Sequence, residues 1–271
     1  MTQVVGGSRV GPLLREWRQR RRLSQLDLAL EANISTRHLS YVETGRSRPS
    51  AEMVLHLAER LDVPLRDRNQ LLLAAGHAPA YSQRDLDEPA MGAVREALDR
   101  VLVGHDPYPA VAIDRHWGLV AGNRALGILI AGVDPALLKP PVNVLRLTLH
   151  PDGMAPRIAN FGEWRAHLLE RLGRQAVASG DPALAGLHEE LAALPGGERA
   201  SPDWATGELA VPLRLRHEGT ELALISTITT FGTAIDITVA ELAIESFFPA
   251  DAVTARKLRE LTPVIGPDDV T

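Results

Sequence analysis

Residues 23–50 hold two short amphipathic segments separated by a tight turn, and this pattern constrains the fold more than any other in the chain. Ser24 is placed to cap a helix that begins at Gln25. Asn33 follows that helix, and asparagine tolerates the left-handed backbone that a tight turn often requires. Ser35 is placed to cap the next helix. The stretch therefore predicts two short helices joined by a turn.

Helical patterns on both sides of this pair predict an all-α domain of five helices. Before it, apolar residues recur at i, i+3, i+4 and i+7 from Val10 to Trp17, which is the stripe of an amphipathic helix. After it, Ser50 is placed to begin a fourth helix, and residues 65–75 predict a fifth. We expect this domain to span residues 1–78.

The outer face of the second helix of the pair is polar and cationic. In a helix-turn-helix, the second helix enters the major groove of DNA with its N-terminal residues first. The alternative is an ordinary helical bundle in which Arg37 is merely solvated, but the spacing from Gln25 through Gly45 favours the DNA-binding interpretation. The outward residues of this helix are Thr36, Arg37, Ser40, Tyr41 and Thr44.

The stretch LSQLDLALEANISTRHLSYVETGRSRP resembles the Cro/repressor class of helix-turn-helix, often called the XRE family. The resemblance covers about residues 10–75 and implies binding to double-stranded DNA. Asn33 departs from the family, which most often has glycine there, and asparagine should be tolerable in the turn. The resemblance implies base reading by Thr36, Arg37, Ser40 and Tyr41, phosphate contacts by Gln25, Arg46 and Arg48, and a structural ion pair between Arg18 and Glu43.

The charge distribution favours a polyanion-binding N-terminal part. Residues 1–76 carry 12 arginines against 8 acidic residues, whereas the whole chain has a formal net charge of −5. A basic end on an acidic body suits a protein that binds DNA through that end. Lys139 and Lys257 are the only lysines, so the abundance of arginine also fits a coding bias, and charge alone does not decide the matter.

Residues 79–104 are expected to form a linker and a connecting helix, and residues 105–271 a second domain. Pro79 and Pro89 interrupt the helical periodicity, which resumes over residues 91–104. Beyond residue 109, short β-prone runs alternate with helical segments, and three runs near the C-terminus predict strands: ELAVPLRLRHEG, ELALISTITTFG and DITVAELAIESFF. The pattern predicts an α+β domain with an antiparallel sheet and helices on one side, and such a domain resembles a PAS-like sensor domain.

The segments LLLAAGHAPAY, AIDRHWGLVAGN, NVLRLTLHPDG and ISTITTFGTAIDITVAELAIESFFPAD resemble the MmyB-like ligand-binding domain of bacterial regulators, over about residues 105–262. The resemblance implies a pocket for a small apolar ligand, with fatty acids a plausible class. Asn123 or Arg146 is expected to hold a ligand carboxylate. An equally supported alternative is that each residue expected to line this pocket is simply part of the core. Asn123 is also well placed to cap the helix that follows it. The expected lining is Trp117, Asn123, Arg146, Trp164, Leu168, Ile228 and Phe231.

The sequence contains few candidates for catalytic residues. It has no cysteine, which excludes disulfides, thiolate metal sites and cysteine nucleophiles. The histidines are scattered, and the nucleophile-elbow, phosphate-loop and zinc-protease motifs are absent. His150 with Asp152 is best explained as a solvated loop. We therefore expect no catalytic residue, metal or cofactor.

These observations predict a cytoplasmic, one-component transcription regulator. No apolar run is long enough to span a membrane, and the N-terminus has no apolar core like that of a secretory signal. One recognition helix reads few base pairs, so a homodimer on a roughly palindromic site is expected. Two alternatives remain open: a C-terminal domain that serves protein interaction or dimerisation without a ligand, and an enzyme under DNA-binding autoregulation.

Overall fold

The structure, a computed structural model, describes residues 10–196 and 210–262. The chain forms two compact units. The first, called the helical unit below, comprises the chain up to Arg84 together with Thr233–Ala240. The second, called the sheet unit, comprises Asp85–Gly232 and the chain from Glu241 onward. The chain therefore passes between the units at three points rather than at a single linker.

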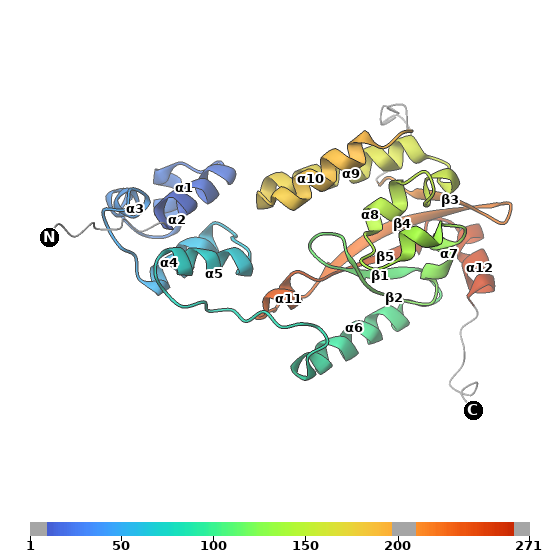
Figure 1. Cartoon of the computed structure of the whole chain (residues 1–271), viewed down its shortest axis with the longest axis horizontal. Helices are drawn as coiled ribbons and strands as arrows, with labels where there is room; N and C mark the ends of the chain where they lie inside the picture. Colours follow the sequence, from blue (N-terminus) through green and yellow to red (C-terminus); the bar gives the residue numbers. More distant parts are fainter. Residues whose placement is uncertain (1–9, 197–209, 263–271) are drawn as a thin grey trace. The chain divides into compact units, whose positions relative to one another are not determined.

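Between residues 10 and 84, the structure describes the five helices that the sequence predicts (Figure 1). Their apolar faces form one core that includes Leu14, Trp17, Leu39, Leu57 and Leu72. Burial of these faces stabilises helices that are too short to be stable alone in water. The helices are α1 (Val10–Arg20), α2 (Gln25–Glu31), α3 (Thr36–Glu43), α4 (Ala51–Arg60) and α5 (Leu65–Ala74).

Serine caps and one left-handed residue set the boundaries of α2, α3 and α4. The hydroxyl of Ser24 accepts a hydrogen bond from the N–H of Asp27 at 3.1 Å. Ser35 and Ser50 cap α3 and α4 in the same way. Asn33 has φ 50°, the left-handed conformation predicted for the turn. Local side-chain chemistry thus places the start of each of these helices.

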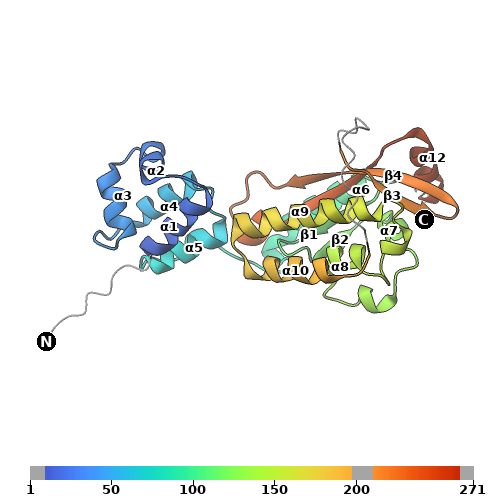
Figure 2. The ribbon, with the colours of Figure 1, turned by 90° about the horizontal axis from the view of Figure 1, so that it is seen from above.

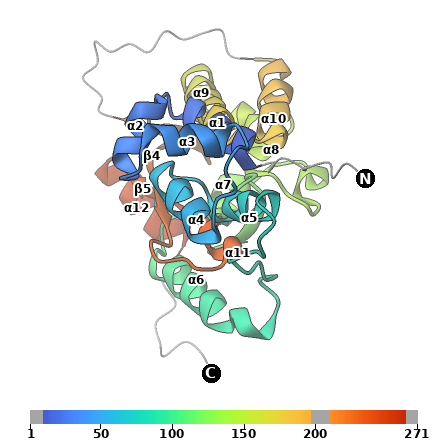
Figure 3. The same ribbon diagram turned by 90° about the vertical axis from the view of Figure 1, so that its left-hand side faces the viewer.

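One segment of the helical unit comes from the C-terminal half of the chain. It contains α11 (Ile237–Ala240), which contacts α5 (Figure 3). The N–H of Ile237 donates to the carbonyl of Ser82 at 2.9 Å. Ile237 and Val239 are buried, as is the carboxylate-bearing Asp236. Nothing in the local sequence pattern predicts this attachment.

The described part of the sheet unit contains a five-stranded antiparallel sheet in the order β2-β1-β5-β4-β3. This confirms the predicted α+β domain. The last pair of the β4–β5 ladder joins Thr230 to Ala243, and the chain between these two residues carries α11. The strands are β1 (Ala110–Ile113), β2 (Leu119–Gly122), β3 (Leu213–His217), β4 (Thr220–Thr230) and β5 (Ala243–Pro249).

Helices cover both faces of the sheet, whereas the sequence analysis expected them on one side. Leu98 and Leu102 of α6 (Gly92–Gly104) pack with Ala110 and Ala112 of β1. The alternate residues of β1 belong to the main core, which includes residues of α9. Because β1 is buried at all four positions, both of its faces need apolar cover.

The remaining helices of the sheet unit surround the main core. The long helices α9 and α10 lie side by side, as Figure 2 shows. These helices are α7 (Leu126–Ile130), α8 (Val144–Leu149), α9 (Phe161–Ser179), α10 (Pro182–Ala193) and α12 (Ala252–Leu261), with 3₁₀ turns at Pro89–Met91, Pro135–Leu138 and Ala155–Arg157.

The strand predicted over DITVAELAIESFF is wrong in its first half. Residues Ile237–Ala240 form a helical turn, and the strand begins at Ala243. The carboxylate of Asp236 accepts a hydrogen bond from the N–H of Thr238 at 2.9 Å, which favours the start of a helix. The predicted strand ELAVPLRLRHEG begins at Leu213 in the structure, and residues 208 and 209 lie outside the described residues.

Candidate DNA-binding face and ligand cavity

The outer face of α3 carries the four residues expected to read bases. Thr36 and Arg37 are exposed, and Ser40 and Tyr41 are half-buried, while Leu39 and Val42 anchor the other face in the core. The helix therefore keeps its polar side accessible without loss of core contacts.

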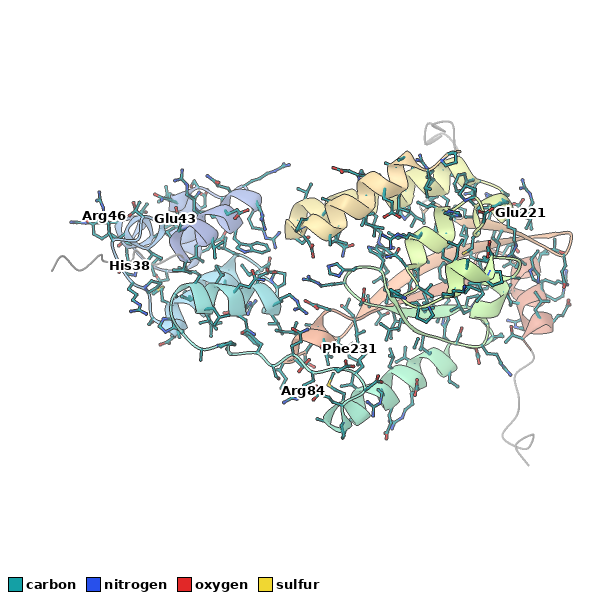
Figure 4. All side chains as sticks on the ribbon, in the orientation of Figure 1. His38, Glu43, Arg46, Arg84, Glu221 and Phe231 are labelled. Atoms are coloured by element: carbon teal, nitrogen blue, oxygen red, sulfur yellow. The ribbon has the colours of Figure 1, made fainter. Side chains whose placement is uncertain are left out.

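Arg37 and Tyr41 are organised by mutual contacts. The Nε of Arg37 donates to the hydroxyl of Tyr41 at 2.9 Å, and its guanidinium carbon lies 5.3 Å from the ring centroid. Arg46, which follows α3, lies 5.9 Å from the centroid of the same ring. Figure 4 labels Arg46 and His38 in this region. One aromatic ring thus supports two cations, an arrangement suited to bases and phosphates.

Arg18 and Glu43 form a buried ion pair, as the resemblance to the XRE family implies. Arg18 Nε donates to Glu43 Oε1 at 2.6 Å, and Nη2 donates to Oε2 at 3.0 Å. The hydrogen bond with Glu43 raises the pKa of Arg18 above its ordinary value despite the opposing effect of burial. Because both side chains are almost fully buried, the pair joins α1 to α3 inside the bundle rather than facing DNA.

Two of the residues expected to bind phosphate already have partners within the helical unit. Gln25 Nε2 donates to Glu43 Oε2 at 2.8 Å, which orients the amide at the start of α2. Arg48 is exposed, but its Nε donates to the carbonyl of Ala75 at 3.2 Å, near the end of α5. Phosphate contacts by these residues and Arg46 stay predictions.

The sheet unit encloses an apolar cavity of about 60 Å³ between the sheet and helices α7, α8 and α9. Three expected residues line it: Trp117, Trp164 and Leu168. The other lining residues are Val111, Leu119, Leu126, Leu129, Ile130, Leu138, Val144, Leu145, Leu147, Thr148, Met154, Leu213, Glu245 and Phe247.

Asn123 and Arg146 do not line the cavity, contrary to expectation, because each is engaged elsewhere. The amide of Asn123 accepts from the N–H of Ala110 at 3.0 Å and donates to the carbonyl of Tyr108 at 2.7 Å. Arg146 is exposed on α8 and forms a bidentate pair with Glu190, at 2.6 and 2.7 Å. Both residues therefore make contacts that stabilise the fold, and neither is part of the cavity lining.

Ile228 and Phe231 do not line the cavity either. Ile228 is exposed on β4, and Phe231 lies just beyond the end of that strand (Figure 4). Both were expected to line the cavity because of their position near the last hairpin. Hairpin position alone does not determine which strands line the cavity, and in the structure β1, β2, β3 and β5 contribute to it whereas β4 does not.

Glu245 lines the cavity, and the sequence analysis missed it. This glutamate is 5% exposed on β5, and Arg171 Nη1 of α9 lies 3.3 Å from its Oε1. Burial raises the pKa of Glu245 above its ordinary value, although Arg171 and Ser226 act against that rise. A glutamate within the apolar run AIESFF was the one available signal, because a lone acid in a central strand requires a partner.

The two cavity-lining tryptophans differ in their polar contacts. Trp117 Nε1 donates to Gln175 Oε1 at 2.9 Å. Trp164 Nε1 is buried and has no hydrogen-bond partner within the part of the chain that the structure describes. Of these two indole N–H groups, only that of Trp117 therefore has a hydrogen-bond partner within the described residues.

Comparison with known families agrees with this geometry. Residues 14–67 match a helix-turn-helix family, and residues 94–261 match the MmyB-like transcription regulator ligand binding domain. The chain belongs to the MmyB-like transcription regulators. The regulator thus combines a DNA-binding helix-turn-helix with a ligand-binding domain, as the sequence predicts. No curated protein matches this MmyB-like regulator.

The family match includes most of α6, which was expected from the sequence to be part of a connecting segment. In the MmyB-like regulator this helix packs against β1 and belongs to the sheet unit. Over the residues described, no group of three or more histidine, cysteine or acidic side chains is arranged to hold a metal ion. Within the same residues, no helix has the length and apolar character needed to cross a membrane.

Proposed function

We propose that this regulator is a one-component sensor in which a small apolar molecule, entering the cavity of the sheet unit, changes the affinity of α3 for DNA. One observation carries the proposal. Residues Thr233–Ala240, which lie between the neighbouring strands β4 and β5 of the sheet, belong to the helical unit that carries α3.

The attachment of this segment is specific. Arg84 Nη1 lies 3.3 Å from Asp236 Oδ2, and the hydroxyl of Thr238 donates to the carbonyl of Arg84 at 2.6 Å. Together with the bond from Ile237 to Ser82, these contacts hold residues 236–238 against the chain that follows α5. A displacement of β5 therefore pulls on a segment anchored in the DNA-binding unit.

A ligand that enters the cavity is expected to displace β5, because of where the cavity lies and how small it is. Glu245 and Phe247 of β5 line it, only a few residues after α11. Its volume of about 60 Å³ is well below the roughly 300–1,000 Å³ of a typical ligand site, so a ligand must move the lining elements as it enters. The ligand changes the occupancy of DNA only if its affinity differs between the DNA-binding conformation of the protein and the conformation that does not bind DNA.

The proposed ligand class, location and oligomeric state follow from the family resemblance and from the geometry of DNA recognition. A fatty acid is a plausible ligand class for the apolar lining, and the regulator acts in the cytoplasm, where its DNA lies. We expect a homodimer on a roughly palindromic site, with half-sites about one helical turn apart, because a single helix reads few bases. In such a dimer, the ligand changes the spacing of the two α3 helices.

The test combines mass spectrometry with DNA binding by the full chain. Native and denatured samples, purified without added ligand, are compared for a released small molecule. Duplexes selected by the protein from a random pool are then titrated by fluorescence anisotropy with and without the recovered molecule, or with decanoate. The proposal predicts a shift of the DNA-binding curve. Identical curves with the cavity saturated would exclude the coupling, and a chain that binds no small molecule would favour the protein-interaction alternative.

A further inference from the structure

The turn between β1 and β2 holds one residue of the cavity wall in a backbone conformation that large side chains rarely adopt. Trp117 has φ 67°, in the left-handed region, and is buried. Because this conformation costs free energy, a bulky residue keeps it only where the surrounding structure fixes it. Residues 114–118 form the turn, and Asp114 Oδ1 accepts hydrogen bonds from the N–H groups of His116 and Gly118, each at 2.8 Å. We therefore expect the turn to move as one piece.

Gln175 of α9 connects the side chain of Trp117 to the backbone of Arg115. Its Oε1 accepts the indole N–H of Trp117 at 2.9 Å, and its Nε2 donates to the carbonyl of Arg115 at 3.1 Å. Because Trp117 lines the cavity and shares this partner with Arg115, a ligand that displaces the indole also displaces Arg115.

The side chain of Arg115 reaches the chain directly after α11. Nη1 of Arg115 lies 3.6 Å from Oε1 of Glu241, and Nη2 lies 3.2 Å from Oδ2 of Asp181. Asp181 also accepts the N–H of Ala183 at 2.9 Å, so it holds the guanidinium against the start of α10. The side chains of Glu241 and Asp181 are 17% and 14% exposed, so water screens these two pairs less than pairs on the surface. Arg115 thus ties Glu241 to the turn that carries Trp117.

Glu241 lies at the junction between the sheet and the segment that is anchored in the helical unit. α11 ends at Ala240, and β5 begins at Ala243. The four residues of α11 separate Glu241 from Asp236, which is held by Arg84 at 3.3 Å. A displacement of β5 and a displacement of the β1–β2 turn therefore reach α11 through the same residue.

We propose that Arg115 is the positioning residue that couples the cavity to α11, through its ion pair with Glu241. A ligand that displaces Trp117 moves Arg115 together with the turn, and the ion pair passes this movement to Glu241 and to α11. The inference rests on the proposed function and names the contact that carries its regulation. Neither Arg115 nor Glu241 is among the described residues that line the cavity, so loss of the pair should affect the response of DNA binding to ligand and leave ligand binding itself intact.

Glu241→Gln tests the pair, because it removes the charge and keeps the size of the side chain. Anisotropy titrations of the full chain with the selected duplex, with and without decanoate, give the ratio of the two DNA affinities. We expect this ratio to be at least about fivefold in the wild type and less than about twofold in Glu241→Gln. Titration calorimetry should show that the variant binds decanoate as tightly as the wild type does, which a general loss of folding would not allow.

Glu221→Gln is the matched control, because it removes an equivalent ion pair elsewhere in the sheet unit. Arg214 Nη1 lies 3.6 Å from Oε1 of Glu221, the same separation as in the pair under test. Glu221 lies near the start of β4, whereas the segment that carries α11 follows the other end of that strand (Figure 4). This variant should keep the full ligand response. An equal loss of response in both variants would overturn the inference, because the loss would then not depend on contact with Arg115.

Hydrogen exchange of the amides locates the step at which the response is lost. In the wild type, decanoate should change the exchange of residues 144–149, which include part of the cavity wall, and of residues 237–241. In Glu241→Gln, the change over residues 144–149 should remain and the change over residues 237–241 should disappear. A change over residues 237–241 that persists in the variant would contradict the role given to the pair.

Two outcomes separate the role of the ion pair from the proposed function. A full ligand response in Glu241→Gln would overturn the role of Arg115 and leave the proposed function intact. A wild-type protein whose DNA affinity is the same with and without bound decanoate would overturn the proposed function, and the role of Arg115 with it.

Discussion

Arg84 and Asp236 form an ion pair across 152 residues of sequence, with Arg84 Nη1 3.3 Å from Asp236 Oδ2. Asp236 is buried, and its second carboxylate oxygen accepts the N–H of Thr238 at 2.9 Å. One aspartate therefore both starts α11 and joins it to the chain after α5. This places a residue from the middle of the ligand-binding sheet sequence inside the DNA-binding unit.

Asp236→Ala should abolish the effect of ligand binding on DNA affinity. We expect the affinity for the ligand to stay within about twofold, because Asp236 does not line the cavity. The effect of the ligand on DNA affinity, which is about 5- to 150-fold in typical allosteric proteins, should be lost. Anisotropy titrations with and without ligand measure both quantities.

Asp251→Ala is the matched control, because Asp251 also caps a helix, accepting the N–H of Thr254 at 2.7 Å at the start of α12. Asp251 belongs to the sheet unit, so its loss should leave the response of DNA binding to ligand in place. A full ligand response in Asp236→Ala would contradict transmission through this segment.

The buried pair of Arg18 and Glu43 should contribute strongly to stability. Arg18→Met leaves the carboxylate of Glu43 buried without its cation, and we expect the free energy of unfolding to fall by about 3–5 kcal/mol. The double variant Arg18→Met/Glu43→Leu should lose less than the sum of the two single variants. Urea unfolding measures all three.

The exposed i,i+4 pair of Arg100 and Glu96 in α6 serves as comparison. Arg100→Met should change stability by about 0.5 kcal/mol, because water screens the pair. Equal effects at Arg18 and Arg100 would show that burial does not set the energy of these pairs.

Arg37→Ala should weaken specific DNA binding by about 1–3 kcal/mol and blur the preference for one base, if the guanidinium reads guanine. Arg60→Ala on α4 removes the same charge from another exposed position of the helical unit. It should reduce affinity less and leave base preference unchanged. Binding to a panel of single-base variants of the selected duplex distinguishes the two, and an unchanged preference in Arg37→Ala would remove this residue from the base-reading set.

Asp181 should make the sheet unit sensitive to acid. Burial by itself raises its pKa, but hydrogen bonds from His116 and the N–H of Ala183, with the charge of Arg115, outweigh burial and hold the pKa of Asp181 below its ordinary value. A lowered folded pKa stabilises the protein above the pKa of the unfolded aspartate, about 3.9. This stabilisation is lost as pH falls through the folded pKa.

Asp181→Asn should therefore reduce the free energy of unfolding by about 1–2 kcal/mol at neutral pH, with a smaller difference from the wild type below about pH 4. Urea unfolding of both proteins across this range measures the effect. A difference that is constant with pH would show that the charge of Asp181 is not its cause.

Local patterns explain why the helical unit was predictable. Ser24, Ser35 and Ser50 cap neighbouring backbone N–H groups, and Asn33 adopts the left-handed turn, so each signal acts within a few residues. The cavity was predictable only in part. Trp117, Trp164 and Leu168 line it, whereas the place of Glu245 depends on β5 lying at the centre of the sheet, a position set by pairing with distant strands.

The sequence by itself determined the order of the two domains, the helix-turn-helix and the antiparallel character of the second domain. These features depend on caps, turns and periodicities that operate over a few residues. Only the tertiary structure decided that Ile237–Ala240 is helical and belongs with α5, that Asn123 and Arg146 do not line the cavity, and that Glu245 does. Each depends on partners far apart in the chain, and local propensity does not specify such partners.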